Sequence, residues 1–248
     1  MIGYWLTQAL TNAGVDKPVL ALVTQVLVDA ADPAFAAPTK FIGPVYKRAQ
    51  AGRLAGEHGW TVAPDGPHWR RVVPSPVPVR LLEQATVEQL LRTGAVVVCG
   101  GGGGAPVTAD TGGRLRGVEA VVDKDRTAAM LAGVVHADHL LVLTDVPAVM
   151  DNFGTPSATP LHTLTLDQLE RRRFPEGSMG PKIDACVQFV RATGRPATIG
   201  ALADAAALLT GAAGTTVRPT PPQFSSNPPD PNGTRRSSAL PSQIGRNC

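Results

Sequence analysis

The 248-residue sequence is poor in cysteine, aromatic residues and charge, and these shortages exclude several classes of protein. Its three cysteines are widely spaced and form no CxxC pair, which argues against a disulfide scaffold or a zinc site and suits a reducing cytoplasm. The five histidines show no metal-ligand spacing. No apolar run approaches the ~20 residues that a transmembrane helix needs. The first residues also lack the basic region and cleavage site of a secretory signal.

The excess of positive charge is small and lies mostly at one end. The formal net charge is +3, and in the last thirty residues Arg235, Arg236 and Arg246 against Asp230 account for +2 of it. The remainder of the chain is therefore close to neutral. We expect neither a nucleic-acid-binding face nor a membrane partner.

What the sequence does contain, from about residue 86 onward, is an alternation of short β-branched runs with helical patterns. This alternation is typical of βαβ units around a parallel sheet. Strands are predicted at 95–99, 118–122, 140–143 and 196–199. Helices are predicted at 86–91, 126–136, 166–174, from about 181, and at 202–209.

Two segments interrupt the alternation. Residues 29–80 are rich in proline and glycine and have no clean period, so we interpret them as an inserted, partly β subdomain. Residues 219–248 are rich in Pro, Ser and Asn with few apolar side chains, and are expected to be a disordered tail because they cannot bury enough surface to offset their ordering entropy. Residues 1–218 then form the folded domain.

A glycine run, Gly100 to Gly104, directly follows the predicted buried strand at 95–99. Glycines at the carboxyl end of a parallel strand let the backbone approach an anionic ligand and present N–H groups to it. A flexible connector is the alternative interpretation, but a connector has no reason to follow a buried strand directly. A nicotinamide-binding fingerprint is disfavoured because Pro106 and the short apolar step after it offer no helix start.

Two lysines occupy predicted strand-to-helix junctions, where a cation opposes the helix dipole. Lys124 lies between two aspartates, and Lys182 follows Pro181 at the start of the long helix. Asp125 is a plausible N-cap, and a single such lysine could be an ordinary surface residue. Two such lysines at junctions of one sheet favour a clamp for a polyphosphate. The negative charge of the phosphates would offset the unfavourable placement of a cation at the positive end of a helix dipole. Thr144 and Asp145 end an aliphatic strand, where either a ligand contact or an Asx turn is expected.

Several motifs resemble those of carbamate kinases, in the same order and spacing. They include P-T-K-F-I-G-P-V-Y at 38–46, W-R-R-V-V-P-S-P at 69–76, G-V-E-A-V-V-D-K-D at 117–125 and G-S-M-G-P-K at 177–182. The resemblance runs from Met1 to about Val217, and the first two motifs separate carbamate kinases from other amino-acid kinases. The tail has no counterpart.

The resemblance implies a three-layer α/β/α sandwich with a mostly parallel central sheet, from which residues 29–80 protrude. It implies reversible phosphoryl transfer between ATP and carbamate, giving ADP and carbamoyl phosphate, with Mg²⁺ bridging the phosphates. A cytoplasmic homodimer in arginine catabolism is expected. The sequence does not assign the metal ligands.

The resemblance also implies roles for individual residues. Lys40 would reach from the protruding subdomain toward the transferred phosphoryl group. Lys124 and Lys182 would neutralise its charge, and Asp125 would hold these lysines. The substrate loop would comprise Gly101, Gly102, Gly103 and Gly104, and the nucleotide-binding residues would be Thr144, Asp145, Val149, Met150, Ser178, Met179 and Gly180.

The sequence departs from the family pattern in two respects. Pro147 and Met150 stand where an acidic residue and a tyrosine are usual. Family members also begin with a strand and glycine/asparagine turns that precede a segment like the first residues here, so a chain without them is expected to be unstable and nearly inactive. Two hypotheses follow: a carbamate kinase, or a non-catalytic remnant that retains the nucleotide half.

Overall fold

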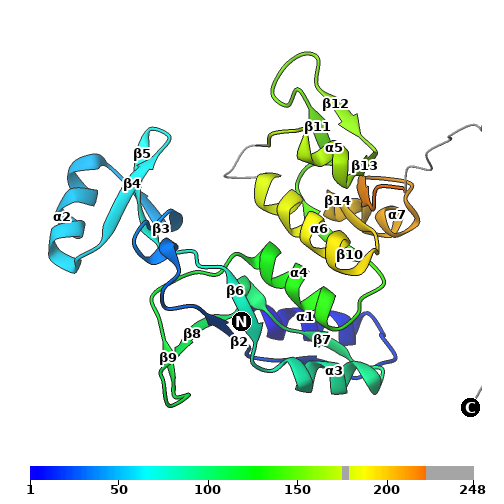
Figure 1. Cartoon of the computed structure of the whole chain (residues 1–248), viewed down its shortest axis with the longest axis horizontal. Helices are drawn as coiled ribbons and strands as arrows, with labels where there is room; N and C mark the ends of the chain where they lie inside the picture. The colour runs from blue at the N-terminus through cyan, green and yellow to red at the C-terminus, as the bar shows by residue number, and fades with distance from the viewer. Residues whose placement is uncertain (175–178, 222–248) are drawn as a thin grey trace, which may run out of the picture.

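The computed structural model describes residues 1–174 and 179–221, which form an α/β body and a small protruding unit (Figure 1). The α-helices are α1 (Ile2–Asn12), α2 (Arg48–His58), α3 (Gln84–Arg92), α4 (Lys124–Val134), α5 (Leu166–Glu170), α6 (Met179–Thr193) and α7 (Ala205–Thr210). None of these helices is long and apolar enough to cross a bilayer. The tail predicted at 219–248 lies almost entirely outside the described residues.

The strands of the body hydrogen-bond in separate groups. Strand β1 (Val19–Ala21) pairs in parallel with β7 (Val96–Val98). A second sheet has the order β6 (Pro78–Leu81), β2 (Gln25–Val28), β8 (Ala105–Ala109), β9 (Leu115–Gly117). A third has the order β10 (Leu140–Thr144), β14 (Ala197–Ala201), β15 (Thr215–Arg218), β13 (Thr163–Thr165), beside a hairpin of β11 (Val149–Asp151) and β12 (Thr159–Leu161). The predicted α/β class is confirmed, with parallel pairing at β1–β7, β2–β8, β10–β14 and β13–β15.

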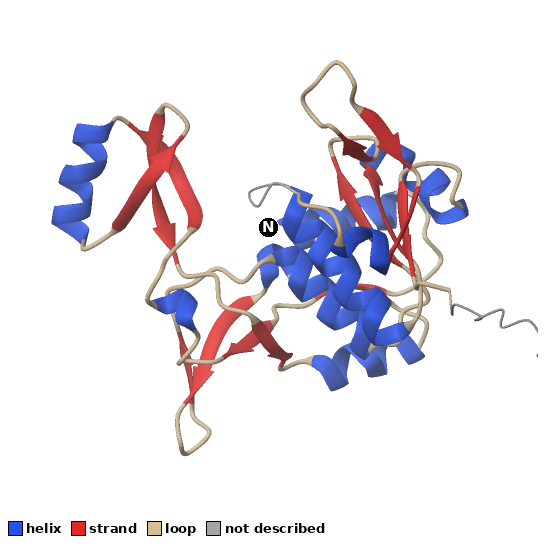
Figure 2. Ribbon diagram, turned by 45° about the horizontal axis from the view of Figure 1, so that its top comes forward, coloured by secondary structure: helices blue, strands red, loops and turns tan. Residues whose placement is uncertain are grey.

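The protruding unit is a three-stranded antiparallel sheet with one helix against it. Its order is β3 (Lys40–Tyr46), β5 (His68–Val73), β4 (Thr61–Asp65), with α2 joining β3 to β4. Figure 2 shows the unit standing apart from the body and joined to it by loops. Its arginines lie over its aromatic rings: the Arg71 guanidinium is 4.6 Å from the Trp60 centroid, and that of Arg48 is 5.5 Å from Trp69. Such cation–π contacts help a small unit with few apolar residues to hold together.

Asp32 ties the two ends of this unit to each other. Its carboxylate accepts a hydrogen bond from the Ala34 N–H at 2.8 Å, at the start of the short 3₁₀ turn Pro33–Phe35, and one from the Val77 N–H at 2.9 Å. These backbone bonds, that to Ala34 first, hold the pKa of Asp32 below its ordinary value. The chain therefore leaves the body and returns to it at one point.

Helix α4 lies between α6 and α3 in Figure 1, and its side chains pack against two hydrophobic cores. On one side its Ala129 and Ala132 pack in the core that α6 fills with Phe189. On the other side its Met130 and Leu131 pack beside the core built on Val26, Leu81 and Val122. Small alanines allow α6 to approach α4 closely, and this approach brings the first turns of the two helices together.

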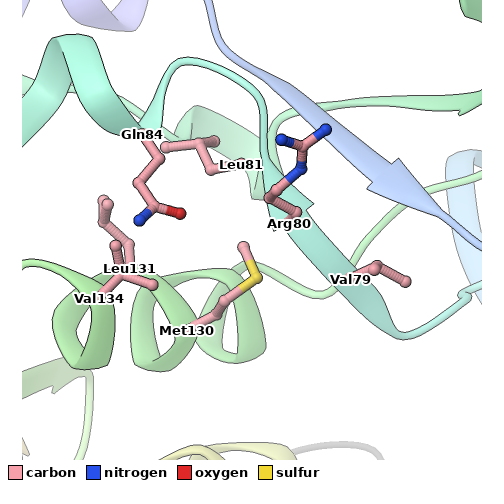
Figure 3. Close-up of a pocket in the computed structure, with 7 residues that line it drawn as sticks. All are labelled: Val79, Arg80, Leu81, Gln84, Met130, Leu131 and Val134. Atoms are coloured by element: carbon pink, nitrogen blue, oxygen red, sulfur yellow. The ribbon is translucent and has the colours of Figure 1, made fainter. Parts of the chain in front are cut away.

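The contact between α4 and β6 leaves a cavity of only about 40 Å³ (Figure 3). Side chains from β6, the start of α3 and one face of α4 surround it: Val79, Arg80, Leu81, Gln84, Met130, Leu131 and Val134. Small-molecule sites have volumes of roughly 300–1,000 Å³. A nucleotide therefore cannot bind in this cavity.

The strand predicted at 118–122 does not form. Within this segment the Val118 N–H donates to the Pro106 carbonyl and the Val121 N–H to the Pro74 carbonyl, which lie on different segments. A β-strand requires its successive residues to hydrogen-bond to one neighbouring strand. Val122 is instead a fully buried side chain of the second core.

The largest differences in bounds or helix type occur in three of the predicted helices. Helix α4 begins two residues before 126 and ends at Val134, close to His136, whose φ of 53° is not helical. Helix α5 ends at Glu170 rather than 174, and Arg172 leaves it to pair with Asp151 of β11 at 3.0 Å. The helix predicted at 202–209 is a 3₁₀ turn at Leu202–Asp204 followed by α7.

Candidate active site

The N-terminus of α4 is capped by Asp123, so the alternative interpretation of Asp125 as the N-cap is wrong. Asp123 Oδ1 accepts the N–H groups of Asp125 at 2.9 Å and Arg126 at 3.2 Å, which satisfies two donors of the first turn. The sequence D-K-D offers two candidate caps, and the extended backbone of Asp123 makes it the one that precedes the helix. Asp125 therefore lies in the first turn with its carboxylate free for other partners.

Asp125 brings two of the predicted lysines together. Its Oδ2 accepts hydrogen bonds from Lys182 Nζ at 3.0 Å and from Lys124 Nζ at 3.4 Å. The side chains of Asp125 and Lys182 are 10% and 14% exposed, whereas that of Lys124 is 62% exposed. Lys182 comes from the first turn of α6, which packs along α4. Lys182 is thus fixed within the protein, and Lys124 extends into solvent beside it.

Lys40, the third predicted lysine, comes from the protruding unit. It is the first residue of β3, and its Nζ lies 2.7 Å from Asp123 Oδ2. Burial would raise the pKa of Asp123, but the hydrogen bond and charge of Lys40, together with the two backbone N–H groups, outweigh it and hold the pKa below its ordinary value. Three ammonium groups therefore surround two carboxylates, which leaves one net positive charge at the positive end of a helix.

The glycine run lies directly beside these residues. It forms a 3₁₀ turn at Gly101–Gly103 after β7, and the Thr127 hydroxyl of α4 donates to the Gly103 carbonyl at 2.9 Å. A β-carbon on Gly103, whose φ is 103°, would lie 2.1 Å from the Val122 carbonyl oxygen. The Gly100 N–H donates to the Thr24 hydroxyl at 2.9 Å. The run is thus packed against α4 and β2 and is not a loose connector.

Gly101 and Gly104 line a cleft of about 560 Å³. Its other walls come from Met1 and α1, from the end of β1 and the segment after it, and from the first residue of β8: Met1, Gly3, Tyr4, Ala21, Leu22, Val23, Thr24 and Ala105. This volume is within the range of small-molecule sites. The three lysines do not line the cleft, but Gly103 connects it to α4 through Thr127.

The predicted nucleotide-binding residues lie at the end of β10, in β11 and at the start of α6. Thr144 ends β10 and its hydroxyl donates to Asp145 at 3.1 Å. Val149 has a buried side chain in the core, and its N–H donates to the Thr215 hydroxyl at 2.8 Å. Met150 is half-buried in the next strand position. Met179 and Gly180 open α6, one turn before Lys182, while Ser178 lies outside the described residues.

Among the described residues, no three His, Cys, Asp or Glu side chains gather as ligands of a metal ion. Asp123 and Thr127 are site residues that the sequence interpretation missed. For Asp123 the signal was present, since an aspartate immediately before the first helical residue is a common cap. Its hydrogen bond with Lys40 joins residues 83 positions apart in the chain, and no local sequence pattern predicts such a contact.

Cys186 of α6 offers a probe of this region. Burial raises the pKa of its thiol to about 12; the Asp125 carboxylate adds to this increase and Lys182 opposes it. Because the thiolate is the reactive form, we expect Cys186 to resist iodoacetamide at pH 8 in the native chain and to react fully after unfolding. Peptide mass spectrometry of both samples measures this. Equal alkylation of Cys186 in the two would contradict the described packing.

Comparison with known proteins identifies the family. The amino acid kinase family model matches residues 17–201. The chain is 46% identical to the carbamate kinase of Rhizobium meliloti (strain 1021), over 88% of this chain and 68% of that protein. It is 45% identical to the carbamate kinase of Escherichia coli (strain K12), over 88% and 72%. The solved structure of carbamate kinase from Giardia lamblia bound to AMP-PNP matches with a TM-score of 0.79 and 34% identity, over 88% of this chain and 72% of that one. The chain belongs to the amino acid kinase family, and within it to the carbamate kinases.

Proposed function

We propose that this chain is a carbamate kinase, which transfers a phosphoryl group reversibly between ATP and carbamate to give ADP and carbamoyl phosphate. The observation that carries the proposal is the group of Lys40, Lys124 and Lys182 around the carboxylates of Asp123 and Asp125. The names and identities of the curated relatives support it. The three lysines and two carboxylates lie together at the N-terminus of α4, which favours the enzyme over a non-catalytic remnant.

The chemistry of phosphoryl transfer matches these residues. A carbamate oxygen attacks the γ-phosphorus of ATP while the bond to the bridging oxygen of ADP breaks, and the charge spreads over the equatorial phosphoryl oxygens. Catalysis then depends on fixed positive charge at those oxygens rather than on a protein nucleophile. Lys182, held by Asp125 and little exposed, provides charge that needs no rearrangement. Lys124 adds charge from the solvent side, and Lys40, paired with Asp123, adds charge from the protruding unit.

We infer that the adenine nucleotide binds along the edge formed by the end of β10 and the first turn of α6, near Thr144, Asp145, Met150, Met179 and Gly180. The Giardia lamblia relative was solved with AMP-PNP, an ATP analogue, which supports an adenine nucleotide here. Val149 would contribute only through its backbone, since its side chain is in the core. Mg²⁺ would arrive as part of the nucleotide, held mainly by phosphate oxygens and water, which is its usual mode in kinases.

The same proposal extends to the setting of the enzyme. We infer a cytoplasmic homodimer that runs toward ATP, using carbamoyl phosphate from arginine catabolism. Helix α1 supports a subunit contact, because Ile2, Tyr4 and Trp5 each expose more than half of their surface. A row of exposed large apolar side chains on one helix is typical of interaction surfaces.

The missing initial strand and turns predicted a nearly inactive chain, whereas the group of three lysines and two carboxylates favours activity. We therefore expect the 248-residue chain to form ATP from ADP, Mg²⁺ and carbamoyl phosphate. A luciferase-coupled assay measures the ATP, and a reaction without carbamoyl phosphate corrects for disproportionation of ADP. Calorimetry measures ADP binding in parallel. Binding without turnover would support the remnant hypothesis, and absence of both would contradict the nucleotide site as well.

A further inference from the structure

Asp123 uses its two carboxylate oxygens for two different elements. Oδ1 accepts the first-turn N–H groups of α4, and Oδ2 accepts Lys40 Nζ at 2.7 Å. Its side chain is only 9% exposed, so the carboxylate has little freedom to turn. One buried side chain thus connects the N-terminus of α4, where Lys124 and Asp125 lie, to β3 of the protruding unit.

The remaining links between the protruding unit and this segment do not set the position of Lys40. Arg71 of β5 pairs with the exposed side chain of Glu119, and the Val121 N–H donates to the Pro74 carbonyl. Both join the unit to the loop before Asp123, but neither contacts the Lys40 side chain. A lysine on a unit attached by loops has many rotamers, and holding one of them requires a fixed partner. Asp123 is that partner.

We propose that Asp123 is a positioning residue, which holds the Lys40 ammonium at the N-terminus of α4 so that the transferred phosphoryl group meets it already in place. This inference rests on the proposed function. Both oxygens of Asp123 are occupied by protein donors, so it would act on the reaction through Lys40. A cationic group placed before reaction needs less rearrangement in the transition state, and misplacement by about 1 Å can cost a hundredfold in rate.

Asp123→Asn separates positioning from capping. Asparagine is as good an N-cap as aspartate, so α4 keeps its cap, but the neutral amide no longer pairs with an ammonium. We expect kcat for ATP formation to fall roughly ten- to a hundredfold, with KM for ADP unchanged. Asp123→Ala, which removes cap and charge, is the comparison. A melting temperature close to that of the unmodified chain for Asp123→Asn shows that its cap persists.

A double-mutant cycle with Lys40→Met tests whether Asp123 acts through Lys40. If it does, adding Asp123→Asn to Lys40→Met lowers kcat by less than about twofold, because the partner is already absent. The full loss in both backgrounds would overturn the proposal and leave Asp123 as a structural cap. An unchanged kcat in Asp123→Asn alone would overturn it as well.

A second measurement does not depend on turnover. Acetylation of lysines by acetic anhydride, followed by peptide, is expected to be several-fold faster at Lys40 in Asp123→Asn than in the unmodified chain, because the amine is released from its partner. Lys47, an exposed lysine of the same unit, is the internal reference. Unchanged labelling of Lys40 would overturn the positioning role, whereas failure of ATP synthesis in the unmodified chain would contradict only the proposed function.

Discussion

Replacing Lys182 with methionine is expected to lower kcat for ATP formation by about a hundredfold or more, the scale seen when one preorganised charge-stabilising donor is removed. Methionine retains most of the length and apolar contact of the side chain but has no charge. Lys182 is the least exposed of the three lysines and is held 3.0 Å from Asp125, so its charge is the one that solvent screens least. A coupled assay at saturating carbamoyl phosphate measures the change.

Lys47→Met is the matched control for Lys182→Met. Lys47 is exposed and lies before α2, away from both aspartates, so its loss should leave kcat unchanged. Circular dichroism and a melting curve show whether the Lys182 variant is still folded, since Asp125 retains only Lys124 as a partner. Turnover of a folded Lys182→Met at the rate of the unmodified chain would remove Lys182 from the mechanism.

Replacing Gly103 with alanine is expected to destabilise the fold by about 4 kcal/mol or more, a magnitude reserved for severe clashes and strain. The added β-carbon would lie 2.1 Å from the Val122 carbonyl oxygen, and a φ of 103° is strained for any residue with a side chain. The obstructing atom belongs to the backbone, so no side-chain rotation relieves the contact. The midpoint of urea unfolding gives the loss.

Gly101→Ala provides the comparison within the same turn. Gly101 has a negative φ, and a β-carbon added to it would meet no atom within 4 Å, so its substitution should change the free energy of unfolding by less than about 1 kcal/mol. Similar midpoints for the two variants would mean that Gly103 is not packed against Val122. The glycines of this run therefore differ: some are needed for the fold, and others are available for a ligand.

Regular local patterns predicted much of this fold. The aliphatic run at 140–143 is β10, and the helix predicted from about 181 is α6. Each pattern arises because a helix buries one face and a central strand buries both faces, so the spacing of apolar residues reports them directly. The strand prediction at 118–122 is wrong because a β-branched segment can also pass through the core once without pairing to a strand, as it does at Val122. Only the neighbouring segments determine whether such a run becomes a strand.

For the candidate site, the sequence predicted the lysines but not the partner that holds one of them. Lys124 and Asp125 are adjacent, and their relation to Lys182 came from a resemblance to a family. The pair of Lys40 and Asp123 depends on where the protruding unit returns to the body, which is a property of tertiary structure. The choice of Asp123 over Asp125 as the cap depends on a single backbone conformation, which residue preferences do not resolve.

The carboxylate of Asp32 closes the protruding unit at its base by binding a backbone group 45 residues away. With the ends of a loop fixed, its length affects stability only logarithmically, and each doubling costs roughly 0.6 kcal/mol. Evolution or an engineer could therefore lengthen, shorten or exchange the turn at Gly66 between β4 and β5 without changing the register of β2 and β6 in the body. This turn would serve as an attachment point for a fluorophore or a foreign loop. A fluorophore there would report on the candidate site from a position that tolerates substitution.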